Sequence, residues 1–223
     1  MKTRRSATVV ISSAAILLGL ATLAQAGPPL VCHPFDIGTS KTLPPVDLNQ
    51  KGSGSYDVNN LTQDTLAILN SGAPVLVRME TLRRATIYAR QNPQVAKELI
   101  TRLRARLDES QGGPAAALAT FDYGYLAETY KQWFGAGEPN PAAGVDGYAL
   151  IKNAISMRGE DAEMEFAAAL ITLNGPKSGH QQHVRKAQAG AKEDPLLAQN
   201  LASRFPGQAT SELHAAPSGE LSK

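Results

Sequence analysis

The chain has 223 residues, of which 43% are hydrophobic and 5% aromatic, and this length suits a single domain. Its formal charge is +2, but Lys2, Arg4 and Arg5 lie in a segment that we expect to be removed, which leaves 19 of the 22 basic residues against 20 acidic ones. A nearly neutral mature chain disfavours nucleic acid as a partner, because binding phosphates requires a clustered positive surplus.

Residues 1–26 have the pattern of a secretory signal peptide. A basic start is followed by an apolar stretch over residues 7–23, and Ala24-Gln25-Ala26 supplies the small residues that a signal peptidase requires. The apolar stretch is shorter than a membrane-spanning helix needs, and no later segment is apolar enough to span a bilayer. We therefore expect cleavage after Ala26, a secreted or periplasmic protein, and no transmembrane segment in the mature chain.

Residues 27–58 are rich in proline, glycine, serine and aspartate and have no helical period. This composition predicts an extended arm. Its apolar residues are expected to pack the arm against the rest of the protein, and they are Leu30, Val31, Phe35 and Ile37.

Cys32 is the only cysteine, so an internal disulfide is excluded. Cys32 and His33 are a thiol and an imidazole on the arm, and His180 and His183 are spaced to share one helix face. If the arm folds back, these four side chains would supply the ligands of a tetrahedral metal site. Because nothing in the sequence brings the two pairs together, our leading prediction is a protein without a metal or cofactor, and this site is the alternative.

Residues 59–205 are helical in pattern almost throughout, and strand signals are nearly absent. Prolines at the expected helix starts and a stop signal at Asn174-Gly175-Pro176 divide the stretch. The pattern predicts an all-α domain of about eight helices, near 60–70, 74–91, 93–109, 114–134, 146–158, 162–173, 179–192 and 195–205. Residues 206–223 form a polar tail that we expect to be disordered.

Three short stretches in this domain share one register: 82–85, 151–154 and 184–187. Each ends in an alanine, and seven residues later comes a helix-capping residue, which is Asn92, Asp161 or Asp194. A small alanine allows two helices to approach closely, and the cap binds the free N–H groups at the start of the next helix. The register predicts repeated units of helix, turn and helix.

The spacing of large, small and aromatic residues in this domain resembles the first helix of tetratricopeptide-like repeats, at Tyr123, Leu126, Ala127 and Tyr130. Gly147, Ile151 and Ala154 fit other positions of that repeat. The sequence departs from the pattern at residues 135–145, which interrupt a short turn, and at Gly159, which replaces a closing proline. The resemblance implies a right-handed α-α superhelix, or an irregular bundle of helical hairpins, that binds a protein or peptide and does not catalyse a reaction.

Half of the aromatic residues fall within residues 121–134. We predict that this helix is a recognition surface covered by the 135–145 loop, with five binding residues: Tyr123, Tyr125, Tyr130, Trp133 and Phe134. The alternative interpretation is that it is the central helix of the bundle, buried on more than one face.

Residues 74–110 carry eight positive charges, which we expect to lie mostly on a solvated helix face: Arg78, Arg83, Arg84, Arg90, Lys97, Arg102, Arg104 and Arg106.

No HExxH zinc motif, nucleophile elbow or phosphate-binding glycine loop is present in the sequence. The sequence therefore predicts an exported helical protein that binds a protein or peptide, and not an enzyme.

Overall fold

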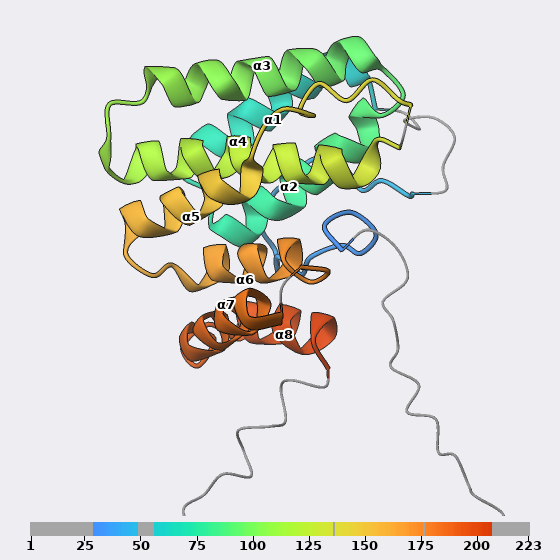
Figure 1. The fold of residues 1–223 in the computed structure, drawn as a ribbon. Coiled ribbons are helices and arrows are strands. Elements are labelled where there is room, and N and C mark those ends of the chain that lie inside the picture. The colour runs from blue at the N-terminus through green and yellow to red at the C-terminus, as the bar shows by residue number, and fades with distance from the viewer. Residues whose placement is uncertain (1–28, 49–55, 136, 176, 207–223) are drawn as a thin grey trace, which may run out of the picture.

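The structure is a computed structural model, and it describes residues 29–48, 56–135, 137–175 and 177–206. These residues form eight α-helices and one 3-10 helix, and no strand occurs among them (Figure 1). The elements are η1 (Val58–Asn60), α1 (Leu61–Asn70), α2 (Val75–Ala89), α3 (Pro93–Glu109), α4 (Gly113–Trp133), α5 (Gly147–Arg158), α6 (Ala162–Ile171), α7 (Lys177–Gly190) and α8 (Pro195–Arg204). The prediction of an all-α domain of about eight helices is confirmed.

Two of the predicted segments lie outside the described residues. These are the signal peptide over residues 1–26 and the tail from residue 207 onward. Among the residues that the structure does describe, no helix has the length and apolar character needed to cross a membrane.

The predicted units of helix, cap and helix are present. The side chains of Asn92, Asp161 and Asp194 accept hydrogen bonds from backbone N–H groups at the starts of α3, α6 and α8. The small alanines of the preceding helices are fully buried, at positions 85, 154 and 187. Each cap satisfies donors that would otherwise lack a partner, which fixes where the second helix of each unit begins.

Helix α4 is the centre of the bundle, because it packs against α2, α3, α5 and α6. Helix α2 also contacts α6 directly. An open superhelix would keep these two helices apart, so the arrangement is an irregular bundle, the second of the two predicted architectures.

Residues 29–48, here called the arm, lie against the outer side of α2 and reach α8 (blue in Figure 1). The predicted packing of Leu30, Val31, Phe35 and Ile37 is confirmed, since all four are buried. With the arm on one side and the bundle on the other, every residue of α2 except Arg84 is buried.

The predicted solvated face of basic residues is therefore wrong for α2. Arg78 and Arg83 are only 1% and 3% exposed, and both are bound by carboxylates. The prediction holds on α3, where Lys97, Arg102 and Arg104 are exposed. Arg83 is buried because the arm covers it, whereas Arg78 is buried inside the bundle, where it binds Asp122 of α4. The outer face of α3 has no such cover, so its basic side chains stay exposed.

Candidate functional site

The predicted aromatic recognition surface is wrong, and the alternative of a buried central helix is correct. Tyr125 and Tyr130 are fully buried, while Tyr123 and Phe134 are 6% and 7% exposed. The cause is that α4 has neighbouring helices on several sides, so its aromatic residues point into the core wherever they fall on the helix. Three of them pack against a ring nearby in the chain: Tyr125 stacks on Phe121 with ring centroids 5.5 Å apart, and Tyr130 meets Phe134, the residue after α4, edge to face.

Trp133 is the exception among the five, because it is only partly buried. The guanidinium of Arg90 lies 4.8 Å from the centre of its ring. Arg90 also donates a hydrogen bond to Glu138 in the loop after α4. Trp133 therefore has a neighbour that covers it and joins the end of α4 to that loop.

The four candidate metal ligands are not brought together. His180 is buried, and its Nδ1 lies 2.9 Å from the carbonyl oxygen of Ala169. No group of three or more histidine, cysteine, aspartate or glutamate side chains within the described part of the chain is placed to hold a metal ion. Cys32 and His33 lie on the arm, where the backbone carbonyl of His33 accepts a hydrogen bond from Arg204.

His183 takes part in a different cluster, which joins α5, α6 and α7. Its Nδ1 lies 2.5 Å from Oε2 of Glu165, and its Nε2 lies 2.8 Å from the hydroxyl of Tyr148. Lys186 contacts the other oxygen of Glu165 at 3.1 Å. Burial opposes ionisation of Glu165, but the hydrogen bonds from His183 and Lys186 outweigh it and lower the pKa of this carboxyl. Both ring nitrogens of His183 are thus occupied by protein groups.

The arm is held by side chains of the bundle that bind its backbone. The clearest case is Asn200 on α8, whose side-chain amide makes two hydrogen bonds to one arm residue. Its Oδ1 accepts from the backbone N–H of Asp36 at 3.0 Å, and its Nδ2 donates to the carbonyl oxygen of Asp36 at 2.9 Å. One side chain therefore satisfies both polar backbone groups of one arm residue.

Helix α2 binds the arm backbone through a buried ion pair. Oε2 of Glu80 accepts from the backbone N–H of Phe35 at 3.0 Å, and Nη1 of Arg83 donates to the carbonyl oxygen of Val31 at 3.0 Å. Glu80 and Arg83 are themselves paired at 2.7 Å. Since each charge is satisfied by the other and by the arm, neither is left uncompensated in the interior.

Further contacts of the same kind extend along the arm. Gln132 on α4 accepts from the N–H of Leu30 at 2.9 Å, and Arg84 on α2 donates to the carbonyl oxygen of Leu43. We call the side chains that bind the arm backbone, together with the apolar surface under the arm, the arm-binding surface. Its polar members are Glu80, Arg83, Arg84, Tyr88, Gln132, Asn200 and Arg204.

Phe35 supplies an apolar anchor on this surface. Its ring meets Phe166 of α6 edge to face, with centroids 6.0 Å apart, and the guanidinium of Arg204 lies 4.8 Å from its centre. Burial lowers the pKa of Arg204 to about 10, so this side chain is still charged at neutral pH. Arg204 therefore contacts both the ring of one arm residue and the backbone of another.

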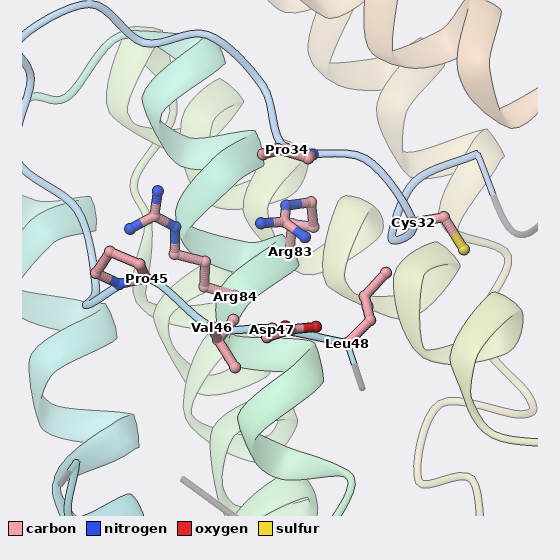
Figure 2. Close-up of a pocket in the computed structure, with 8 residues that line it drawn as sticks. All are labelled: Cys32, Pro34, Pro45, Val46, Asp47, Leu48, Arg83 and Arg84. Atoms are coloured by element: carbon pink, nitrogen blue, oxygen red, sulfur yellow. The ribbon is translucent and has the colours of Figure 1, made fainter. Parts of the chain in front are cut away.

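Beside this surface lies a cavity of about 590 Å³ (Figure 2). It lies between α2 and two runs of the arm, residues 32–34 and residues 45–48. Arg83 and Arg84 reach it from α2, while Cys32 and Pro34 come from the first run of the arm. The second run supplies the remaining lining residues, Pro45, Val46, Asp47 and Leu48. Burial raises the pKa of the Cys32 thiol, although Arg204 and Arg83 oppose this effect.

Sequence reasoning found the arm and its apolar anchors but missed the side chains that hold its backbone. One signal was available. Asn200 is a polar residue at helical spacing from Leu196 and Leu197, and it is followed by Leu201 on the same helix. A polar side chain in that position needs a hydrogen-bonding partner once the face is buried.

No protein-family model, curated protein or solved structure matches this chain. The resemblance to tetratricopeptide-like repeats therefore stays a prediction.

Proposed function

We propose that this protein is an exported helical scaffold that binds an extended peptide segment of a partner protein on the arm-binding surface. Its own arm is the intramolecular occupant with which such a peptide competes. This keeps the predicted protein- or peptide-binding role and moves the site from the aromatic helix to α2, α4, α6 and α8.

The observation that carries this proposal is the pair of hydrogen bonds between the amide of Asn200 and the backbone of Asp36. Contacts to backbone groups do not depend on the side chains of the bound segment, because every residue except proline offers the same N–H and C=O. Glu80 and Arg83 act in the same way at Phe35 and Val31. A surface that satisfies the backbone of the arm is suited to bind another segment of similar shape.

Selectivity would come from the apolar anchors. The side chains of Leu30, Phe35 and Ile37 project from the arm and are buried. A competing peptide therefore needs apolar side chains at matching positions. The attached arm has a high effective concentration at its own site, which a free peptide must overcome. Wild-type protein should therefore bind such peptides weakly, and a protein with a weakened arm should bind them more tightly.

The test uses the full chain with Phe35→Ala and a labelled peptide with the sequence of residues 29–38, in which the cysteine is replaced by serine. The phenylalanine of the peptide can then fill the place that the substitution empties. We expect affinity at least about tenfold higher than for the wild-type chain, measured by fluorescence anisotropy. The peptide should also raise the melting temperature of the Phe35→Ala protein, because a ligand that binds only the folded state stabilises it.

Three controls make this result specific. A peptide of the same composition in scrambled order should bind weakly, and adding Asn200→Ala to the Phe35→Ala chain should reduce binding of the correct peptide. Met157→Ala, at an exposed residue of α5, should leave binding as weak as in wild type. If Phe35→Ala does not fold, Ile37→Ala weakens the arm at another of its apolar anchors. A folded variant that does not distinguish the two peptides would contradict the proposal.

A further inference from the structure

We propose that the cavity between the arm and α2 binds a carboxylate carried on an apolar group. The cavity shares Arg83 and Arg84 with the arm-binding surface, but its other lining residues belong to the arm itself (Figure 2). Its volume of about 590 Å³ is within the range of small-ligand sites.

The walls of the cavity match the two parts of such a ligand. Pro34, Pro45, Val46 and Leu48 supply apolar surface, and the guanidiniums of Arg83 and Arg84 supply hydrogen-bond donors (Figure 2). Apolar walls with a few placed polar groups are typical of sites for small molecules, in which the polar groups fix the orientation of the ligand.

Arg84 is the group that we expect to bind the carboxylate. Its Nε donates to Glu80 at 2.6 Å and its Nη1 donates to the carbonyl oxygen of Leu43. Its Nη2 makes no hydrogen bond to any residue that the structure describes. The contacts to Glu80 and Leu43 hold the guanidinium in place, so its remaining N–H groups are oriented before a ligand arrives. A guanidinium has N–H groups spaced to bind both oxygens of a carboxylate.

The charges around the cavity also favour an anion. Arg83 and Arg84 line it, and Arg204 lies close enough to act electrostatically on both Arg83 and Cys32. Against these three positive charges stand Glu80, which pairs with Arg83 and Arg84, and Asp47 on the exposed rim. Glu80 and Asp47 balance the two arginines that line the cavity. The surplus positive charge is therefore that of Arg204, which lies outside the lining and favours an anion from there.

This chemistry has two sources, a free monocarboxylic acid or the carboxylate of a bound peptide. Cys32 gives a direct readout for both, because it lines the cavity and is the only cysteine in the sequence. The rate at which a chromogenic disulfide reagent modifies Cys32 in the full chain reports whether the cavity is filled. Ligand-detected NMR with the same compounds gives a second, independent readout.

The probes are hexanoate with its neutral amide, and a short leucine-ending peptide with a free carboxyl end compared with its amidated form. We expect a carboxylate probe to slow modification of Cys32 with a saturable dependence on concentration, and its neutral counterpart to have no effect. An effect of hexanoate assigns the site to free acids, whereas an effect of the peptide alone assigns it to a peptide end. Either result supports the proposal.

The matched variants are Leu48→Asp and Leu48→Asn, which have similar shape and differ in charge. Leu48 is half-buried in the cavity wall, so a negative charge there should weaken binding about tenfold or more relative to the asparagine variant. Arg84→Gln should also abolish binding, while Arg102→Gln on the exposed face of α3 should not affect it. The proposal is wrong if neither carboxylate is bound by either readout, or if Leu48→Asp binds as well as Leu48→Asn.

Discussion

Asn200 and Asp36 lie 164 positions apart in the chain, yet the side-chain amide of the first makes two hydrogen bonds to the backbone of the second. We predict that Asn200→Ala destabilises the protein by about 1–3 kcal/mol, because it leaves the N–H and C=O of Asp36 without these partners. Urea unfolding followed by circular dichroism measures the change. The neighbouring Gln199→Ala, at an exposed position, should change stability by less than about 0.5 kcal/mol. Equal effects of the two substitutions would show that the arm contact is not stabilising.

A second prediction concerns Asp122, which is fully buried between two arginines. Its Oδ2 lies 2.6 Å from Nη1 of Arg78 and 2.5 Å from Nη1 of Arg106. Asp122→Asn removes the counter-charge of both, so we expect a loss of about 3–5 kcal/mol in the free energy of unfolding.

The matched control for Asp122 is Asp108→Asn, which breaks the exposed pair between Arg104 and Asp108 on α3. Because solvent screens exposed pairs, the cost there should be much smaller than at Asp122. Chemical denaturation of both variants decides the matter, and similar losses would contradict the importance of the buried network.

The third prediction is a pH dependence at Glu163 on α6. Its Oε2 accepts from the backbone N–H of Leu76 at the start of α2, and burial raises its pKa to about 7. Because the folded state prefers the protonated carboxyl, its contribution to stability is fully present below the ordinary pKa of about 4.5 and is lost as the pH rises through 7. Glu163→Gln keeps an acceptor for Leu76 and cannot ionise.

We therefore expect Glu163→Gln to stabilise the protein more at pH 8 than at pH 5. After allowance for the partial exposure of this side chain, the gain at pH 8 should be about 1–2 kcal/mol. Thermal unfolding of both proteins at the two pH values measures it. A gain that is the same at both pH values would show that Glu163 does not titrate in this way.

The fourth prediction concerns the crossing of α4 and α5 at Gly124 and Gly147. A methyl group added at Gly124 would lie 2.8 Å from the carbonyl oxygen of Gly147 and 2.8 Å from Cβ of Leu150. Gly124→Ala should therefore destabilise the protein, by about 1–3 kcal/mol, since the two helices would have to separate. Gly179→Ala on α7 meets no atom within 4 Å and should instead stabilise its helix by about 0.5–1 kcal/mol. Thermal unfolding should therefore show a lower melting temperature for Gly124→Ala and a higher one for Gly179→Ala than for the wild-type protein.

Local signals in the sequence were sufficient to predict the helices. The apolar period and the capping residues Asn92, Asp161 and Asp194 act within one or two helical turns, and the structure has the predicted caps at all three. The apolar anchors of the arm were also predictable, because a run such as Leu30-Val31 must be buried somewhere.

The burial of α2 was not predictable from the same signals. Arg83 is a charged residue of the kind found on solvated helix faces. It is buried because the arm packs over it, and the arm residue that it binds, Val31, is 52 positions away in the chain. The prediction of a recognition surface on the aromatic helix was wrong for a related reason. The sequence shows that Tyr125 and Tyr130 lie on one helix, but not how many neighbours that helix has. The cavity between the two runs of the arm is formed by residues far apart in the chain, so no sequence motif predicted it.

Peptide binding at the place of the arm is tested by an amide NMR titration of the Phe35→Ala chain with the peptide of residues 29–38. We expect the side-chain amide signals of Asn200 to shift on binding, together with backbone signals around Arg83 and Arg204. Signals on the exposed face of α3, such as that of Arg102, should stay unchanged. Saturable binding with shifts confined to other surfaces, and none at Asn200, would show that the peptide does not bind on the arm-binding surface.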